Sequence, residues 1–300
     1  MAVPNLPELF PGFETRMVEG DGATLHVRIG GEGPPLVLLH GYPQSGVMWH
    51  KVVPDLSKHF TCIIPDLRGY GQSSIPASQA GQGYSKRAMG QDIAAMMTRL
   101  GHESFALVGH DRGARVAYRM GLDHGDRLTR IAVLDILPTL EYWRQMDWRY
   151  GLKIYHWLFL AQPYPLPENL ISGASTYYLQ HTLASWTAAR NLSAFDARAL
   201  EHYRTFFADP ARIHALCEDY RAGAGLDMDQ DAADREAGRT IDVPLLALWG
   251  GHGLAPGSSP LDVWREWAPG AQGQAINAGH FVAEENPEET TEALLAFLRR

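Results

Sequence analysis

The chain contains only two cysteines in 300 residues, Cys62 and Cys217. Two thiols cannot form the disulfide framework of a small secreted domain, and Cys62, inside the apolar run TCIIPDL, is predicted to be a buried thiol. No window approaches 18 apolar residues, so no helix is expected to span a membrane. The beginning, MAVPNLPELFPGF, has neither the basic start nor the apolar segment of a signal peptide. These absences predict a soluble, cytoplasmic protein with no membrane partner.

The sequence also lacks any block of five or six like charges. Its formal net charge is −8, and the isoelectric point is near 5.9. A basic surface that binds nucleic acid is therefore not expected. A small anionic substrate remains compatible with this composition, because individual arginines decide such binding. No segment repeats or has low complexity.

Short apolar runs bounded by turn residues recur along the chain, with helical patterns between them. Near-continuous apolar runs are typical of parallel strands buried on both faces, whereas residues 23–31 alternate and predict an antiparallel edge hairpin. Met89, Ile93 and Met97 recur at helical spacing and predict a helix that faces the core. Strands alternating with helices predict an α/β fold with right-handed crossovers. The predicted buried strands are 34–41, 60–69, 105–111, 131–136 and 244–251.

One connection is far longer than the others. From Ile136 to Pro244 no strand pattern occurs, and aromatic residues and helix formers dominate. A crossover between parallel strands needs only about a dozen residues, so the excess predicts an inserted helical cap. We expect an α/β core over 1–137 and 242–300 and a cap over 138–241.

The segment GHDRGAR, residues 109–115, has the strand–turn–helix context of a nucleophile elbow, with aspartate where hydrolases commonly carry serine. Gly109 and Gly113 permit strand and helix backbones to approach closely. Asp111 would then stand at the carboxyl edge of the sheet, where α/β proteins bind ligands. The alternative is a helix N-cap, a position that aspartate favours. The elbow context leads us to interpret Asp111 as a nucleophile.

The general base is expected after the last strand, where AINAGHFVAEENPEE supplies His280. A lone histidine is more often structural, but its place after Asp111 in chain order favours catalysis. The acid that orients this base has two candidate positions. Asp262 follows a loop without carboxylates, GHGLAPGSSP, and fits the start of a helix. Asp135 ends the apolar run IAVLDI, where a charge without a partner is unfavourable, so we predict Asp135 as the acid.

An aspartate nucleophile indicates a reaction different from that of serine. A carboxylate is suited to displacing a leaving group from a saturated carbon, which forms an alkyl ester on Asp111. Water activated by His280 would then attack the carbonyl of that ester and regenerate the aspartate. The backbone N–H groups of Tyr42 and Arg112 are expected to hold the oxyanion.

Two arginines, Arg112 and Arg115, follow the nucleophile three residues apart and can share one face at the start of the helix. Two guanidiniums exceed what pairing with Asp111 requires, and a guanidinium fork matches a carboxylate in a bidentate way. The pattern predicts a substrate carboxylate bound beside the attacked carbon. The alternative is a surface helix with salt bridges.

Together these segments resemble the haloacetate dehalogenases of the fluoroacetate-dehalogenase family, within the α/β-hydrolase fold. The resemblance rests on LPELFPGF, HGYPQSGVMWH, PDLRGYGQS, GHDRGAR, LDILPT, YGLKIYHW, CEDYRAGAG and AGHF, which extend over nearly the whole chain. It implies hydrolysis of fluoroacetate to glycolate and halide. It places the family's nucleophile on Asp111, its acid on Asp135 and its base on His280, with Arg112 and Arg115 as the carboxylate-binding arginines.

The resemblance further implies a halide site made of His156, Trp157 and Tyr220, with Trp186 lining the same pocket. All three halide-site residues can donate hydrogen bonds, although YHW read alone would indicate cap packing. Tyr42 replaces a residue that is often Phe in relatives and would add a polar group at the pocket mouth. The family implies a homodimer with contacts through the cap, and neither a cofactor nor a metal. We assign no role to the loop 251–259.

The nearest competing function is epoxide hydrolysis, which also uses an aspartate nucleophile on this fold. Epoxide hydrolases need cap tyrosines that protonate the epoxide oxygen, and they usually carry Trp where this chain has Arg112. An epoxide offers no carboxylate to that arginine, which favours the haloacid. A haloalkane dehalogenase would not need the arginines, and a non-enzymatic binding protein would not need both Asp111 and His280.

Overall fold

The computed structural model describes residues 6–253 and 259–300. These residues contain one eight-stranded sheet in the order β1-β2-β4-β3-β5-β6-β7-β8. The pairs β1–β2 and β2–β4 are antiparallel, and the other neighbours are parallel. The strands are β1 (Glu14–Glu19), β2 (Thr24–Gly30), β3 (Pro35–Leu39), β4 (Thr61–Pro65), β5 (Phe105–His110), β6 (Leu128–Leu134), β7 (Leu245–Gly250) and β8 (Gln272–Ile276).

The five predicted buried strands are confirmed as β3, β4, β5, β6 and β7, and the predicted fold class is correct. β5 is buried at every position, which explains its uninterrupted apolar run. The predicted antiparallel edge hairpin is also confirmed. β2 pairs with the mostly exposed β1, which forms the edge of the sheet, and its other side pairs with β4.

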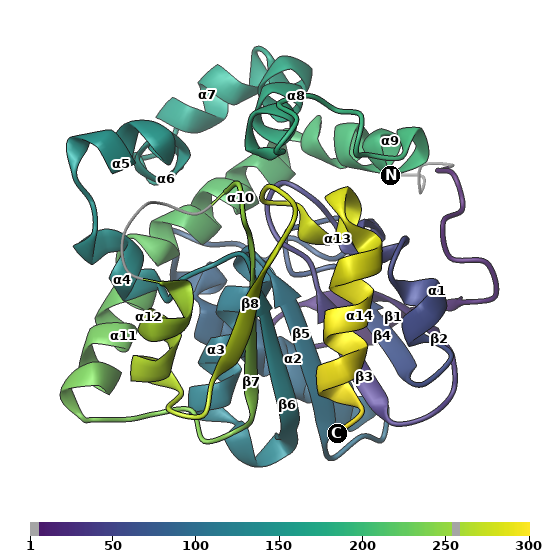
Figure 1. The fold of residues 1–300 in the computed structure, drawn as a ribbon. Coiled ribbons are helices and arrows are strands. Elements are labelled where there is room, and N and C mark those ends of the chain that lie inside the picture. Colours follow the sequence, from purple (N-terminus) through teal and green to yellow (C-terminus); the bar gives the residue numbers. More distant parts are fainter. Residues whose placement is uncertain (1–5, 254–258) are drawn as a thin grey trace.

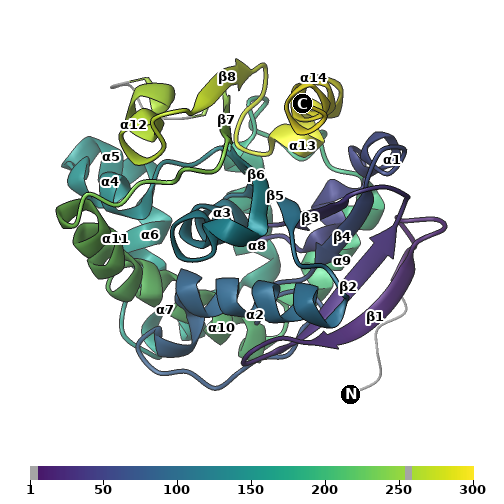
Figure 2. The ribbon, with the colours of Figure 1, turned by 90° about the horizontal axis from the view of Figure 1, so that it is seen from below.

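Helices cover both faces of the sheet (Figure 2). α2 and α3 pack together on one face, and α1 and α14 lie on the other. Met89, Ile93 and Met97 of α2 are fully buried, as their spacing predicted. No described helix is long and apolar enough to cross a membrane. The bounds are α1 (Val53–Leu56), α2 (Lys86–Arg99), α3 (Arg112–Asp123), α12 (Pro260–Trp267), α13 (Val282–Glu285) and α14 (Pro287–Leu298).

All the regular secondary structure in the long connection between β6 and β7 is helical. Most of its helices lie above the sheet, at the edge where the parallel strands end (Figure 1). They place aromatic and polar side chains over the carboxyl ends of β5 and β6. The helices are α4 (Thr139–Arg144), α5 (Trp148–Lys153), α6 (Tyr155–Leu160), α7 (Leu166–Ser172), α8 (Ser175–Trp186), α9 (Ala197–Phe207), α10 (Pro210–Gly223) and α11 (Leu226–Glu236).

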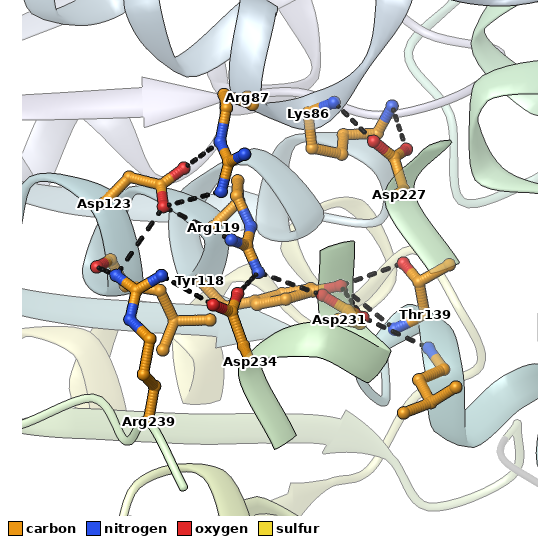
Figure 3. Close-up of polar contacts among 12 residues, drawn as sticks. Lys86, Arg87, Tyr118, Arg119, Asp123, Thr139, Asp227, Asp231, Asp234 and Arg239 are labelled. Carbon is orange, nitrogen blue, oxygen red and sulfur yellow. Dashed lines mark hydrogen bonds and ion pairs between the residues drawn. The ribbon is translucent and has the colours of Figure 1, made fainter. Parts of the chain in front are cut away.

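Acidic residues of α11 are buried in ion pairs with the core helices (Figure 3). Asp227 accepts from the backbone N–H of Lys86 at 2.7 Å. Arg119 of α3 pairs with both Asp231 and Asp234. Such pairs add little net stability when they form, but removing one partner costs about 3–5 kcal/mol because the other charge stays buried. The network therefore fixes α11 in one position against α2 and α3.

In contrast to these paired carboxylates, the buried carboxyl group of Glu284 in α13 has no cationic partner within 4 Å among the described residues. Its Oε2 accepts from the Gln44 amide and, at 3.2 Å, from the Tyr203 hydroxyl. Burial raises the pKa of Glu284 to about 8, against a smaller opposing effect of Lys51. The folded protein therefore holds this group neutral at a pH where the unfolded chain ionises it.

Replacing Glu284 with Gln should make stability less sensitive to alkaline pH. Because the folded pKa is raised, the contribution of Glu284 is fully present below its usual pKa and is lost as pH rises toward about 8. Thermal melts give the difference between the Tm of Glu284→Gln and the Tm of the native protein at each pH. This difference should be several degrees more favourable to the variant at pH 8 than at pH 5. The matched control, Glu292→Gln on exposed α14 surface, should show no such change. An equal Tm difference at both pH values for Glu284→Gln would contradict this account.

Candidate active site

Asp111 occupies the sharp turn between β5 and α3. Its backbone has φ 47° and ψ −116°, a conformation that residues with side chains rarely adopt and that is common at functional sites. The turn depends on close backbone approach, since a Cβ at Gly109 would lie 2.4 Å from the Gly113 carbonyl oxygen. Asp111 precedes α3, but its side chain does not cap that fully described helix. The geometry therefore does not support the alternative interpretation of Asp111 as a helix N-cap.

The structure brings His280 and Asp135 together. His280 Nδ1 lies 2.5 Å from Asp135 Oδ2, and the Gly250 N–H donates to Asp135 Oδ1 at 2.8 Å. Asp135 also has a left-handed backbone, with φ 53°, directly after β6. Asp262, the alternative acid, lies in the first turn of α12 with its side chain exposed, where it faces Arg265 at 3.7 Å. The geometry thus favours the predicted acid over its competitor.

The other imidazole nitrogen faces the nucleophile. His280 Nε2 lies 3.8 Å from Asp111 Oδ2, too far for a direct hydrogen bond. Burial alone would lower the pKa of His280, but Asp135 and then Asp111 outweigh it and raise that pKa. Burial would likewise raise the pKa of Asp111, yet the charges led by His280 and His110 hold it below its usual value. Asp111 is therefore ionised at neutral pH.

The Tyr42 backbone N–H donates to Asp111 Oδ1 at 2.7 Å, as predicted for the oxyanion position. The Arg112 N–H is the first of α3 and has no acceptor within the helix, as is general for such positions. The Tyr42 side chain does not lie at a pocket mouth. It is fully buried, and its ring packs edge-on against that of Tyr220 with centroids 5.1 Å apart.

The two arginines differ sharply in their partners. Arg112 is fully buried and pairs with Asp219 of α10, which accepts from its Nε at 3.1 Å. Burial alone would lower the pKa of Arg112, but the charge and hydrogen bonding of Asp219, with smaller effects of Tyr220 and Tyr70, outweigh it and raise that pKa. Arg115 has no carboxylate within 4 Å among the described residues. Its guanidinium instead lies over the rings of Tyr142 and Trp157, 4.6 and 4.5 Å from their centroids.

The halide-site candidates come from three different helices and lie beside one another. His156 and Trp157 come from α6, Tyr220 comes from α10, and Trp186 ends α8. The centroid of the His156 ring lies 4.4 Å from that of Trp186 and 5.8 Å from that of Tyr220. Within the described part of the chain, neither His156 Nδ1 nor the Tyr220 hydroxyl has a hydrogen-bond partner. Both groups are buried polar atoms free to bind a ligand.

The protonation states suit hydrogen-bond donation to an anion. Burial raises the pKa of Tyr220 well above its usual value, so its hydroxyl keeps its proton. Burial lowers the pKa of His156 to about 3, so at neutral pH the imidazole is uncharged and donates through one nitrogen. Trp157 has a further contact that the sequence did not suggest, because its ring also lies over Arg112, 5.2 Å from the guanidinium carbon.

A cavity of about 340 Å³ brings most of the predicted site residues together. Its walls include Asp111, Arg115, Asp135, His156, Trp157, Trp186 and His280, but not Tyr42, Arg112 or Tyr220. Four further residues bring basic side chains to the same walls. These are Lys153, His181, Arg190 and His252. In the described residues no three His, Cys, Asp or Glu side chains gather as metal ligands.

Sequence reasoning missed the residues that hold the arginines. Asp219 follows Glu218 within the segment CEDYRAGAG and reads as an ordinary helix residue, although it adjoins Tyr220. Thr139, which accepts from Arg115 Nη1 at 3.0 Å, follows the run that ends in Asp135 and carries no signal of its own. Of the loop 251–259, residues 254–258 lie outside the described residues. Lys153 Nζ donates to the Gly253 carbonyl at 2.6 Å at its beginning.

Comparison with known proteins gives consistent results. The profile of the alpha/beta hydrolase fold family matches residues 34–287. Fluoroacetate dehalogenase from Burkholderia sp is 40% identical over 97% of this chain and 95% of its own. Soluble epoxide hydrolase from Corynebacterium sp. strain C12 is 32% identical over 92% of this chain and 94% of its own. A solved structure, a putative alpha/beta hydrolase from Nostoc sp PCC 7120, has a TM-score of 0.92 at 47% identity and covers 95% and 98% of the two chains.

The family match spans the strands of the parallel sheet and the positions of Asp111, Asp135 and His280. The similarity to fluoroacetate dehalogenase extends over nearly the whole chain, as the motifs predicted. The chain therefore belongs to the alpha/beta hydrolase fold family, and its resemblance to fluoroacetate dehalogenase is confirmed.

Proposed function

We propose that this protein is a haloacetate dehalogenase that converts a haloacetate and water to glycolate and halide. The observation that carries the proposal is a pair of groups on one cavity: the ionised Asp111 carboxylate and the Arg115 guanidinium, which has no carboxylate partner among the described residues. A nucleophilic anion close to an uncompensated cation suits a substrate that carries its own carboxylate beside the reacting carbon. Lys153 and Arg190 add positive charge to the same walls and support an anionic substrate.

In the first step Asp111 attacks the carbon that bears the halogen. Its Oδ1 stays bound to the Tyr42 N–H, so Oδ2 is the attacking oxygen. A carbon–oxygen bond forms, the carbon–halogen bond breaks, and the halide leaves with the bonding electrons. No proton moves in this step, which agrees with the 3.8 Å gap between Asp111 Oδ2 and His280 Nε2. A serine would need a base in contact, and an ionised aspartate does not.

In the second step water attacks the Cγ carbon of the Asp111 ester. His280 Nε2 accepts the proton of the water, while Asp135 stabilises the imidazolium through Nδ1. The oxyanion forms at Oδ1 and is held by the N–H groups of Tyr42 and Arg112. Collapse of this intermediate releases glycolate, which takes the proton from His280, and restores Asp111. The regenerated Asp111 carboxyl group then ionises, so the overall reaction releases one proton together with the halide.

We further propose that residues 138–241 form a cap domain whose donors receive the leaving halide. Fluoride is the hardest halide to expel, because its bond to carbon is strong and its charge is concentrated. The partnerless Tyr220 hydroxyl and His156 imidazole, together with Trp157, supply preorganised donors in a buried environment. Three donors at about 1.5–3 kcal/mol each contribute on the order of 5–9 kcal/mol if they act together.

Epoxide hydrolysis is the second candidate, because the Tyr220 hydroxyl is equally suited to protonating an epoxide oxygen. Fluoride and chloride release from fluoroacetate and chloroacetate should be measured beside diol formation from styrene oxide. The proposal expects halide release and no appreciable diol. Diol formation without halide release would instead assign epoxide hydrolysis.

Replacing His280 with Asn should stop the reaction at the ester. Asp111 attacks without a base, whereas hydrolysis needs one, so the displacement survives and the second step fails. Intact-protein mass spectrometry after chloroacetate treatment should show one added carboxymethyl group, on the peptide that contains Asp111. The matched variant His181→Asn, at an exposed histidine of the cavity wall, should turn over without accumulating the adduct. Turnover by unmodified His280→Asn would contradict the mechanism.

Replacing Tyr220 with Phe should slow fluoride expulsion selectively. Loss of one donor should lower the single-turnover rate of ester formation from fluoroacetate by about ten- to hundredfold. Chloroacetate and bromoacetate should be affected far less, because larger halides leave more easily. Tyr150→Phe, at another tyrosine of the cavity, provides the matched control. Equal losses of this rate for all three haloacetates would mean that Tyr220 has only a packing role.

We also propose a homodimer with contacts through the cap. Eight of the ten exposed large hydrophobic side chains in the described residues fall between residues 148 and 177. Such an apolar surface is typical of a protein–protein contact. Light scattering should report a dimer for the native protein and a monomer for Leu158→Glu. Met17→Glu, at an equally exposed apolar side chain on β1, should remain dimeric, and a monomeric native protein would contradict the proposal.

A further inference from the structure

The guanidiniums of Arg112 and Arg115 offer different edges to a ligand. Arg112 uses Nε, at 3.1 Å, and Nη2 to bind Oδ1 of Asp219, and Nη2 also donates to the Asp219 backbone carbonyl at 2.6 Å. The edge formed by Nε and Nη2 is the one that binds a carboxylate side-on. In Arg112 this edge is already occupied by a protein carboxylate. Only Nη1 has no partner among the described residues.

Arg115 presents the opposite arrangement. Its Nη1 donates to the Leu137 carbonyl at 3.1 Å and to the Thr139 hydroxyl at 3.0 Å. These are the hydrogen bonds that the described residues give to this guanidinium, and its buried Nε has no partner. The Nε–Nη2 edge is therefore free in a side chain that lines the cavity with Asp111. Arg115 alone can bind a carboxylate side-on.

The charges around the two arginines lead to the same distinction. Asp219 is shared by Arg112 and Lys86, and Lys86 also faces Asp227 at 3.5 Å. These four charges sum to zero, so Arg112 adds no net charge to the site. The hydrogen bonds that start at Arg115 reach a carboxylate only at Asp231, through the hydroxyls of Thr139 and Tyr118. Asp231 is itself paired with Arg119.

Those two hydroxyls form a continuous chain from Arg115 to α11. Figure 3 shows its part from Thr139 through Tyr118 to Asp231. The Thr139 and Tyr118 hydroxyls lie 2.9 Å apart, and Tyr118 donates to Asp231 Oδ2 at 2.8 Å. A carboxylate only accepts, so the single Tyr118 proton goes to Asp231 and the Thr139 proton is free to point toward Tyr118. The lone pairs of Thr139 are then directed at Arg115. All members of the chain are buried.

We propose that the two arginines have unequal roles in recognition. Arg115 binds the substrate carboxylate side-on through Nε and Nη2, with Thr139, Tyr118 and Asp231 as its positioning residues. Arg112 contributes one hydrogen bond through Nη1 and is positioned by Asp219. This inference rests on the proposed haloacid function and specifies how the acid is held.

Exchanging each arginine for lysine separates the two roles, because lysine keeps the charge and loses the fork. Bromide release from bromoacetate and from uncharged bromoacetamide should be compared, since both share the reacting carbon and leaving group. Arg115→Lys should lower kcat/KM for bromoacetate by about ten- to hundredfold and leave bromoacetamide within about threefold. The ratio of kcat/KM for bromoacetate to kcat/KM for bromoacetamide measures how well the acid is preferred over the amide. Arg112→Lys should reduce this ratio of acid to amide by less than about fivefold. Equal loss of this ratio in both variants would overturn the unequal roles.

The positioning chain is tested at Thr139, with Asp234 as the control on the same ion-pair network. Thr139→Val removes the acceptor for Arg115 Nη1 and should raise KM for bromoacetate about five- to tenfold, with a smaller effect on kcat. Thr139→Ser keeps the hydroxyl and should restore KM. Asp234→Asn removes a partner of Arg119 but not the chain, so it should lower Tm and leave the ratio of acid to amide unchanged.

A purely structural role for Thr139 predicts a different result. Thr139→Val would then lower Tm and reduce activity on acid and amide alike, which overturns the proposal. If the native protein releases bromide from neither compound, the proposed function itself fails. If it releases bromide but prefers the amide, only the arginine assignment fails.

Discussion

The negative charge of the Asp111 carboxylate is the constraint on which the rest of the site depends. Burial penalises this charge, and interactions with His280, His110, Arg112 and Arg115 offset the penalty. The left-handed turn and the Tyr42 N–H fix where the two oxygens lie. An anionic nucleophile repels an anionic substrate, so such a substrate needs a cation that the protein has not already neutralised. In the proposed function Arg115 provides that cation, because it has no carboxylate within 4 Å among the described residues.

The helices between β6 and β7 complete the site as well as cover it. α10 supplies Tyr220 and also Asp219, which fixes Arg112. α11 supplies Asp231, which ends the hydrogen-bond chain from Arg115, and its ion pairs with Arg119 anchor it to α3. α3 itself begins directly after Asp111. Asp111, the two arginines that follow it and the carboxylates that contact them are thus connected through one helix.

The fold followed from the sequence wherever strands were buried on both faces, because their apolar runs are uninterrupted. The more polar strands were harder to place: β8 carries Gln272 and Gln274, and β1 was recognised only as the partner of a hairpin. That Asp111, Asp135 and His280 lie together could be predicted because each follows a strand, where the topology gathers side chains at one edge. Asp219, Tyr118 and Asp231 escaped notice because they act through contacts between helices distant in sequence, which no local pattern reports.

The proposed mechanism requires Asp111 to form a covalent ester whose carbonyl is attacked by water. A single turnover in H₂¹⁸O, with enzyme in excess over chloroacetate, distinguishes this from direct attack, because the oxygen passed to the product comes from the enzyme in the first cycle. We expect unlabelled glycolate and one ¹⁸O atom in the peptide that contains Asp111. Labelled glycolate from that first turnover, with an unlabelled Asp111 peptide, would mean that water attacks the substrate directly and that no ester forms.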